Sequence, residues 1–142
     1  MNQEETAAYL NTVVTVRIAP SPIHGVGVFA IRDLPAGRKL YLDAVPQAHR
    51  ISKGNLSKLF AEVRELLVGR WPRVFVDSVL AYPDARYQAY ANHSDDYNYD
   101  CLTDKLIEDV KAGEEITENY RHIDGWKEAH PWLLGKTPEG MV

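Results

Sequence analysis

Polar side chains crowd into one short stretch, residues 87–100, which reads YQAYANHSDDYNYD. It holds three aspartates, two asparagines, a histidine and a serine. Oxygen ligands at alternate positions are what a calcium loop needs, and Asp96 is followed by Asn and Asp at that spacing. However, Cys101 stands where such a loop needs a glycine, and Ile107 stands where it needs a bidentate glutamate. The stretch therefore does not predict an EF-hand calcium site.

Zinc, iron and a nucleophilic serine are the other chemistries that such residues could support. The chain has five histidines, and no two of them have the i, i+4 spacing of a metal-binding helix. Cys101 is the only cysteine, so neither an internal disulfide nor a cysteine-based zinc site is possible. A serine triad needs a nucleophile in a strained turn, which the run HSD does not provide. We expect no metal, and a polar turn stays open as the simple alternative, because Asp and Asn side chains bond to nearby backbone.

Two further segments combine glycines with charged and aromatic residues. One is SPIHGVGVFAIRDLPAGRKL at 21–40, and the other is VKAGEEITENY at 110–120. Taken in order with NHSDDYN at 92–98, they resemble the SET domain, the fold of AdoMet-dependent protein-lysine methyltransferases. The resemblance covers about residues 14–126, and the chain looks like the minimal single-domain SET proteins of bacteria and large viruses. The cysteine-rich post-SET module of the larger eukaryotic enzymes is absent from the sequence, and so is its zinc.

The resemblance implies a role for each matched residue. The segment at 24–27 would contact AdoMet, since glycine lacks a Cβ and lets a ligand approach the backbone. The Asn-His pair would hold the same cofactor, Asn98 would brace a knot-like thread of chain, and Tyr120 aligns with the family's catalytic tyrosine. The residues implied for cofactor binding are His24, Gly25, Val26, Gly27, Asn92, His93, Tyr120 and, as a partial lid, Trp126. The residues implied for a substrate lysine channel are Tyr90 and Tyr99.

A phenol suits the reaction that the resemblance implies. Methyl transfer is an in-line attack by a neutral amine on a sulfonium methyl, so alignment is most of what the protein must supply. Deprotonating a lysine of pKa near 10.4 costs about 4–5 kcal/mol at pH 7, and an apolar aromatic channel would lower that cost. The Tyr120 hydroxyl would orient the amine while staying neutral. We therefore expect an enzyme that transfers a methyl group from AdoMet to a lysine ε-amine of a basic or histone-like protein.

Three places depart from the family pattern. Ala89 and Tyr90 replace its arginine and phenylalanine, Tyr97 replaces its proline, and Asn119 replaces the aspartate before the last tyrosine. The first change removes internal bracing, and the last removes a charge near the site. These departures leave a second hypothesis open, in which the chain is a catalytically weak SET-like module that binds basic protein tails.

Short elements must position these residues. β-branched runs indicate strands, glycine and proline indicate turns, and one amphipathic run indicates a helix with Asn55 as its N-cap and Gly69 as its stop. The expected strands cover residues 13–19, 25–31, 39–45 and 73–82, a strand–turn–strand unit covers 106–120 around Gly113, and the expected helices cover 55–68 and a short segment within 124–130. This is a mostly β fold with minor α. The resemblance narrows it to a SET-domain, β-clip-like fold of small sheets with a knot-like C-terminal segment.

Length and charge set the expected organisation and partners. A chain of 142 residues fits one domain, which we divide into an N-terminal arm at 1–12 (loose or a short helix), a SET domain at 13–126 and a tail at 127–142. The net charge of −4 argues against a dedicated nucleic-acid binder, so nucleic acid would be met only indirectly. Acidic residues dominate 92–120, which suits a basic protein or peptide substrate bearing lysine, although a solvated acidic face explains the same charges.

The expected location follows from two further features. No apolar run approaches the roughly 20 residues that span a bilayer, so we expect no membrane partner. The N-terminal residues lack the apolar region of a secretory signal, so we expect an intracellular, cytoplasmic chain, with host-directed export left open. A domain without a post-SET lid could complete its site as a homodimer. The target lysine and the number of methyl groups transferred stay open.

Overall fold

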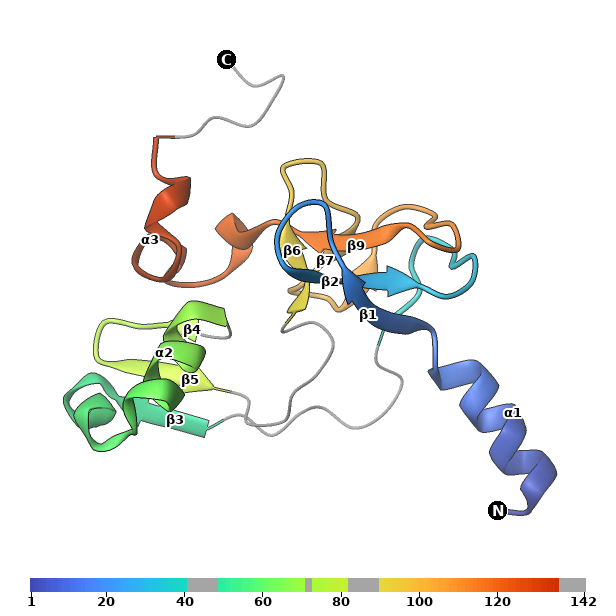
Figure 1. The fold of residues 1–142 in the computed structure, drawn as a ribbon, viewed down its shortest axis with the longest axis horizontal. Coiled ribbons are helices and arrows are strands. Elements are labelled where there is room, and N and C mark those ends of the chain that lie inside the picture. Colours follow the sequence, from blue (N-terminus) through green and yellow to red (C-terminus); the bar gives the residue numbers. More distant parts are fainter. Residues whose placement is uncertain (41–48, 71–72, 82–89, 136–142) are drawn as a thin grey trace.

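The computed structural model describes residues 1–40, 49–70, 73–81 and 90–135. Short strands joined by turns dominate it, which confirms the expected mostly β fold (Figure 1). The α-helices are α1 (Gln3–Val13), α2 (Ala61–Arg70) and α3 (Trp126–Ala129), and the 3-10 helices are η1 (Lys53–Lys58), η3 (Tyr120–His122) and η4 (Pro131–Leu133). The strands are β1 (Val16–Pro20), β2 (Val26–Ala30), β3 (His49–Ser52), β4 (Arg73–Val74), β5 (Ser78–Ala81), β6 (Asn92–His93), β7 (Tyr99–Asp100), β8 (Lys105–Leu106) and β9 (Glu115–Glu118).

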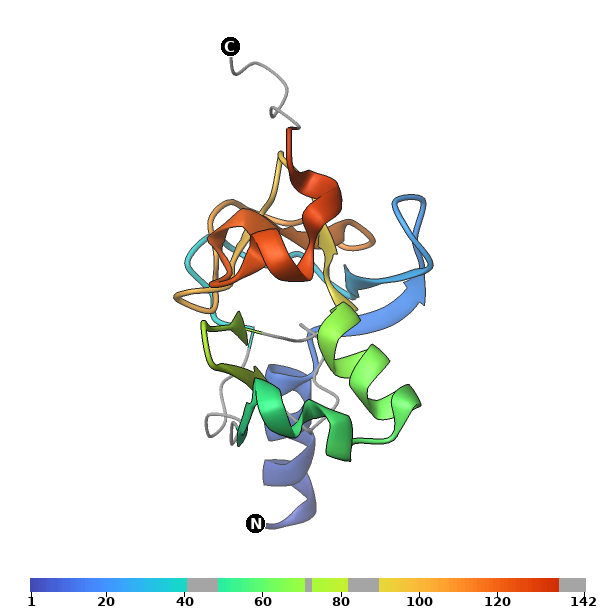
Figure 2. The same cartoon turned by 90° about the vertical axis from the view of Figure 1, so that its left-hand side faces the viewer.

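Two larger sheets organise the molecule, beside the small β7–β8 ribbon. The four-stranded sheet has the order β1-β2-β9-β6, and the three-stranded sheet has the order β3-β5-β4. β6 runs parallel to β9, whereas β2 is antiparallel to both β1 and β9. We call the described residues 49–70 and 73–81 the β3–β5 region. In the two perpendicular views it lies below the four-stranded sheet (Figures 1 and 2).

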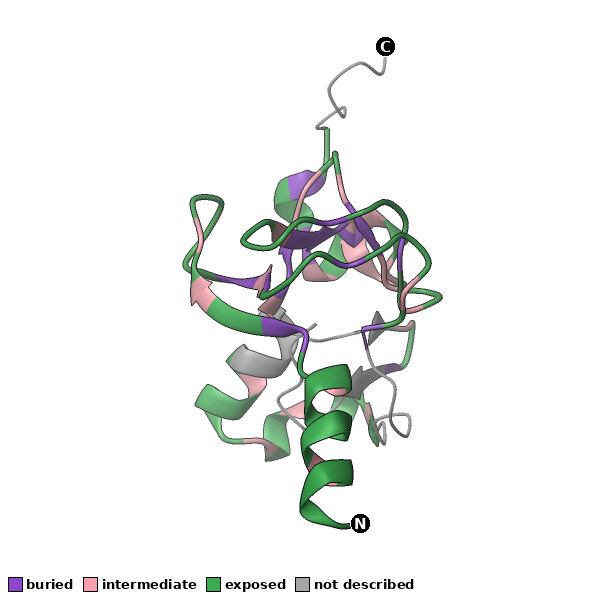
Figure 3. Ribbon diagram, turned by 90° about the vertical axis from the view of Figure 1, so that its right-hand side faces the viewer, coloured by how far each residue is buried: buried purple, intermediate pink, exposed green. Residues whose placement is uncertain are grey.

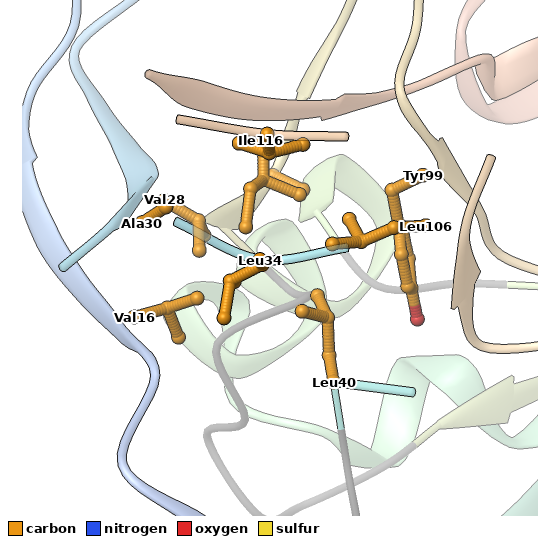
Figure 4. Close-up of a cluster of buried hydrophobic side chains, with 10 residues drawn as sticks. Val16, Val28, Ala30, Leu34, Leu40, Tyr99, Leu106 and Ile116 are labelled. Carbon is orange, nitrogen blue, oxygen red and sulfur yellow. The ribbon is translucent and has the colours of Figure 1, made fainter. Parts of the chain in front are cut away.

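The described hydrophobic core lies with the four-stranded sheet (Figure 4). Ile116, near the middle of β9, has an exposed fraction of 0%. Leu34 and Val110 join the core from the loops, where they exchange backbone hydrogen bonds of 2.7 and 2.9 Å. The core residues are Val16, Val28, Ala30, Leu34, Leu40, Ala91, Tyr99, Leu106, Val110 and Ile116. No described side chain of the β3–β5 region belongs to this core.

The N-terminal arm is helical. Asn2 caps α1, since its Oδ1 accepts from the Glu5 backbone N–H at 2.8 Å and its Nδ2 donates to the Glu5 carboxylate at 3.1 Å. At the other end, the Arg32 and Arg38 guanidinium groups donate to backbone carbonyls at the C-terminal end of the helix, which lack intrahelical partners. The helix therefore extends beyond the expected arm, and the strand expected at 13–19 begins later, as β1. α1 contains no buried residue and projects from the body (Figure 3).

The single helix expected at 55–68 is wrong, because the segment forms two separate helices. Leu59 has an extended backbone with φ −77° and ψ 146°, which ends η1 before α2 begins. Asn55 is not an N-cap, and its Nδ2 instead donates to the hydroxyl of the serine that precedes η1 at 2.6 Å. Phe60 is 74% exposed, so the expected continuous apolar face does not form. Gly69 lies within α2 and does not stop it.

The expected glycine turn after residue 110 is confirmed. Gly113 has a φ of +86°, a conformation that glycine adopts without strain, and the Glu114 N–H donates to the Lys111 carbonyl at 3.0 Å. The strands on the two sides of the turn are not hairpin partners, however. Val110 makes an isolated bridge with Leu34, whereas β9 pairs with β2 and β6. The turn therefore connects the Val110–Leu34 bridge to β9, which lies inside the four-stranded sheet.

The other expected elements hold in part. The strand expected at 25–31 is β2, the strand expected at 73–82 is interrupted by a turn between β4 and β5, and α3 is the expected short C-terminal helix. Lys39 bridges Lys105, and positions 41–45 of the strand expected there lie outside the described residues. Within the described ranges, no helix combines the length and apolarity that crossing a membrane requires. The knot-like thread and the three-part division of the chain stay predictions.

Candidate active site

A cavity of about 510 Å³ lies where three distant segments meet. The segments are the turn before β2, the strand β6, and the C-terminal run from η3 to η4. The volume is within the roughly 300–1,000 Å³ that is typical of small-molecule sites. The lining residues are Ile23, His24, Asn92, His93, Tyr120, His130 and Trp132.

Asn92 ties the first two segments together. Its side-chain Nδ2 donates to the backbone carbonyls of His24 and Val26 at 3.1 and 2.9 Å, and to Glu115 Oε2 at 2.9 Å. The residue is 2% exposed, and its backbone is held in β6 opposite Thr117. The Asn92 side-chain nitrogen therefore holds the turn before β2 against β6, to which it belongs, and against β9.

Gly27 packs against the Glu115 side chain and leaves no room for a Cβ unless that side chain moves. A Cβ at this position would lie 2.3 Å from Glu115 Oε2, far inside van der Waals contact. That carboxylate is held in place, since Ser21 Oγ donates to it at 2.7 Å and Asn92 Nδ2 at 2.9 Å. The expectation that Gly27 opens the backbone to a ligand is therefore corrected, because the Glu115 carboxylate fills that space. Gly25 differs, with a φ of +48° and open space beyond its Cα.

His93 uses both of its ring nitrogens. Nδ1 accepts from the Tyr120 backbone N–H at 3.0 Å, and Nε2 lies 3.0 Å from Asp95 Oδ1. The same carboxylate oxygen accepts from Arg121 at 2.5 Å. Burial lowers the pKa of His93 below 6.5, although the hydrogen bond to Asp95 opposes this shift. The hydrogen bond from Arg121 lowers the pKa of Asp95. The cluster therefore favours a neutral imidazole beside an ionised carboxylate.

Tyr120 is fixed from three sides. Its hydroxyl donates to the Ala91 carbonyl at 2.6 Å, its N–H donates to His93, and its ring stacks on His130 with centroids 4.4 Å apart. The Trp132 ring meets it edge-on at 6.3 Å. Because the hydroxyl proton is donated to a carbonyl, the phenol oxygen can act in any further hydrogen bond only as an acceptor.

The expected site residues fall into two groups. His24, Asn92, His93 and Tyr120 lie together around the cavity. The others do not line it: Gly25 and Val26 lie exposed at the start of β2, Gly27 is buried, Trp126 begins α3, and Tyr90 packs half-buried against the core. The expectation for Gly27 is corrected above, and the roles of the other residues toward a ligand stay predictions.

Tyr99 takes a position that differs from the expected one. Its exposed fraction is 1%, it belongs to the core, and its hydroxyl donates to Asp104 Oδ1 at 2.5 Å. A phenol enclosed in this way packs the β7–β8 ribbon against the sheet. This placement corrects the expectation that Tyr99 lines a substrate channel.

Within the polar stretch, the described residues 90–100 divide between structural turns and the site. Asn98 braces β9, since its Oδ1 accepts from the Thr117 N–H and its Nδ2 donates to the Glu115 carbonyl, both at 2.9 Å, and its expected role in a knot-like thread stays a prediction. Asp100 closes a turn by accepting from the Leu102 N–H at 2.9 Å, and this bond lowers its pKa. Among the described residues, no group of three His, Cys, Asp or Glu side chains is placed to hold a metal ion.

Sequence reasoning missed four residues around this site. Ile23, His130 and Trp132 line the cavity, and Glu115 packs against Gly27. A signal was present for the aromatic pair, because the tail places a histidine and a tryptophan two residues apart beside a proline. Nothing in the sequence distinguished Trp132 from Trp126, since their difference arises from the short helices of the tail.

The lining fits AdoMet by the chemistry of its side chains. Tyr120, His130 and Trp132 present aromatic rings, and ring faces attract a cation such as a sulfonium. Asn92 and His93 add polar groups beside them, and mostly apolar walls with a few polar groups are typical of cofactor sites.

Comparison with known proteins supports the fold. No protein-family profile and no curated protein matches the sequence. The structure is similar to the crystal structure of a Plasmodium falciparum "putative histone methyltransferase", with a TM-score of 0.51 and 17% sequence identity. The similarity covers 80% of this chain and 97% of that chain. At this level of identity the likeness is one of fold.

Proposed function

We propose that this chain is an AdoMet-dependent protein-lysine N-methyltransferase of the SET type. The observation that carries the proposal is the convergence of the His24 turn, the Asn92–His93 strand and Tyr120 on one cavity. These are the elements that the family resemblance expects to meet. The fold similarity to the Plasmodium falciparum "putative histone methyltransferase" agrees with the proposal and does not add a substrate.

The cofactor would be held by the cavity's own residues. His24 and Asn92 would provide polar contacts, and the rings of His93 and Trp132 would provide an aromatic wall. When bound, AdoMet supplies an electrophilic methyl group on a sulfonium. The protein's part is to exclude water and to align an amine with that group, which accounts for most of what such a reaction needs.

Tyr120 would orient the substrate amine. Its hydroxyl proton is donated to the Ala91 carbonyl, so its oxygen would meet a lysine N–H as a hydrogen-bond acceptor. The phenol is neutral near pH 7 and adds no negative charge that would hold the amine in its protonated form. The lysine must still lose a proton, which costs about 4–5 kcal/mol at pH 7 in water. The rate should therefore rise as pH increases above neutrality, with no matching rise in cofactor affinity.

The substrate would be a basic protein or peptide. The chain has a net charge of −4, and its acidic residues are concentrated between 92 and 120. A negative surface raises the local concentration of cationic partners and speeds their association. This support is for the class of substrate, and the target protein stays open.

Methyl transfer from labelled AdoMet to histones and to lysine-rich peptides tests the proposal directly. We expect Tyr120→Phe to lower turnover by roughly 10²-fold, the scale that loss of alignment produces, with AdoMet affinity near that of the wild type. Lys58→Ala is the matched control, because Lys58 is exposed at the end of η1 in the β3–β5 region. A wild-type protein that binds AdoMet and transfers no methyl group to any lysine would contradict the proposal.

A catalytically weak binding module is the second candidate. The observation that favours it is how completely Tyr120 is packed, since its residue is 8% exposed and its ring stacks on His130. Calorimetry separates the two candidates. Binding of a basic peptide without measurable AdoMet affinity would favour the module. Tyr120→Phe would then lower the melting temperature, and no methyl-transfer activity would be lost.

A further inference from the structure

Asp95 joins the two halves of the candidate site. Its Oδ1 lies 3.0 Å from His93 Nε2 on its own segment, and it accepts from Arg121 Nη1 at 2.5 Å, 26 residues along the chain. Arg121 directly follows Tyr120 in η3. One oxygen atom therefore contacts the residue after the proposed catalytic tyrosine and the imidazole that bonds to that tyrosine's backbone.

The hydrogen bonds impose one arrangement of protons on His93. The Tyr120 backbone N–H is a donor, so Nδ1 must act as the acceptor at 3.0 Å. A neutral imidazole then carries its proton on Nε2, which donates to Asp95. Protonation of Nδ1 would place two donors face to face and break the bond to Tyr120. The charged and polar groups beside the ring are Asp95, Arg121 and the rings of Tyr120 and Trp132.

We propose that Asp95 is a positioning residue for Tyr120, acting through His93 on one side and through Arg121 on the other. The inference rests on the proposed function only where it concerns turnover, because the contacts themselves exist in the free protein. Asp95 is not among the residues that the family resemblance matches, so its role would be a property of this chain. Without the carboxylate, the imidazole loses the partner that orients it, and η3 loses its tie to the segment after β6.

The partial exposure of Asp95 makes this role testable. The Asp95 side chain is 35% exposed, whereas the His93 and Arg121 side chains are 9% and 16% exposed. Replacing Asp95 therefore removes contacts at the edge of the site without opening a cavity in the core. Since Asp95 does not line the cavity, its loss should affect the alignment of Tyr120 more than cofactor affinity.

The test compares Asp95→Ala, Asp95→Asn and the matched control Asp124→Asn in the full chain. Asp124 is an exposed carboxylate three residues after Arg121. We expect amide hydrogen exchange at Tyr120 to be faster in Asp95→Ala and unchanged in Asp124→Asn. Asparagine retains an oxygen that can accept both bonds, so Asp95→Asn should restore much of the protection. Tyr120 exchange in Asp95→Ala that equals wild-type exchange would overturn the proposal.

Turnover provides the second measurement. We expect Asp95→Ala to lower the rate of methyl transfer by roughly ten- to a hundred-fold, with a smaller change in AdoMet affinity. Arg121→Ala should have a smaller effect in the Asp95→Ala background than in the wild type, because both changes remove the same contact. Independent, multiplicative effects would overturn the part of the proposal that concerns Arg121.

The two measurements also separate this inference from the proposed function. If the wild-type protein transfers no methyl group, exchange at Tyr120 still decides whether Asp95 positions that residue. If Asp95→Ala does not fold, Arg121→Ala takes its place. Faster exchange at Tyr120 in Arg121→Ala would then support the proposal, and wild-type exchange in that variant would overturn it.

Discussion

The four-stranded sheet and the β3–β5 region differ in what holds them in place. The described core belongs to the four-stranded sheet and its loops, and polar side chains there bond to the backbone of distant strands. The β3–β5 region contributes no described residue to that core and leaves Phe60 74% and Val76 97% exposed. Every described residue that lines the candidate cavity lies outside the β3–β5 region.

This difference shows how very short strands can carry a site. β6 spans Asn92–His93 and could not position two side chains by its own pairing. The Asn92 amide bonds to a carbonyl 68 residues away, and the Asn98 amide bonds to one 17 residues away. Buried side-chain bonds of this kind fix the backbone because leaving them unmade costs about 1–3 kcal/mol each. In this molecule, hydrogen bonds from asparagine side chains help to fix the positions of strands that are too short to be fixed by their own pairing.

Truncation of one apolar residue in each region should give the largest contrast. Ile116→Ala removes a fully buried side chain, and we expect it to lower the free energy of unfolding by about 2–5 kcal/mol. Phe60→Ala removes an exposed ring and should change it by no more than about 0.5 kcal/mol. Urea unfolding of the two variants measures both values. A large loss in Phe60→Ala would mean that the β3–β5 region uses this ring in an interface.

A smaller effect is expected where Gly27 meets Glu115. Gly27→Ala should destabilise the fold by about 1–3 kcal/mol, because the added methyl group displaces a carboxylate that Ser21 and Asn92 hold. Shortening the partner should relieve the clash. Gly27→Ala should therefore cost less in a Glu115→Ala background, which a double-mutant cycle of unfolding free energies measures. Strictly additive costs would show that the strain arises elsewhere.

Sequence patterns were informative where the local residue types determine the conformation. Gly113 predicts a turn because its positive φ suits glycine, and β2 and α3 lie within their expected segments. The resemblance of the three motifs also predicts that His24, Asn92, His93 and Tyr120 meet, and all four line the cavity. These predictions depend on residues that are close in sequence or on a known order of motifs.

The sequence predictions that are wrong have a common cause. Contacts between residues far apart in the chain decide which of several local conformations forms. The apolar spacing at 55–68 predicts one helix, yet the structure breaks it at Leu59 and exposes Phe60. Tyr99 is expected to line the substrate lysine channel, but it belongs to the core and its hydroxyl donates to Asp104. Trp132 reaches the cavity only because a turn at His130 places η4 there, and no spacing in the sequence predicts that.

The pH dependence of stability should separate the site from the β3–β5 region. Burial keeps the pKa of His93 below 6.5 in the folded chain, so the unfolded chain takes up this proton first as the pH falls. The contribution of His93 to stability is therefore complete above about pH 6.5 and declines below it, by at most about 1.4 kcal/mol per pH unit for one proton.

Two asparagine variants measure that contribution. His93→Asn keeps an acceptor at the δ position for the Tyr120 N–H and cannot titrate, so its stability should fall less between pH 7 and pH 5 than that of the wild type. His49→Asn removes an exposed histidine of β3 and serves as the matched control. Thermal unfolding across this range tests the expectation. Identical pH profiles for His93→Asn and the wild type would mean that His93 does not link folding to acid.

The smallest effect is expected for the ion pair that connects the two regions. Lys53 Nζ lies 2.8 Å from Glu128 Oε2 in α3, and the two side chains are 31% and 59% exposed. An exposed pair of this kind contributes about 0.2–1 kcal/mol, and salt screens it, so Lys53→Ala should cost little at low ionic strength and almost nothing near 1 M salt. Lys58→Ala, which removes an exposed lysine of the same 3-10 helix, is the control for the loss of positive charge. α3 directly follows the Tyr120 segment. A larger, salt-independent loss of unfolding free energy in Lys53→Ala, without one in Lys58→Ala, would therefore mean that the β3–β5 region helps to hold the site. The contrast between the two regions would then be weaker than their packing indicates.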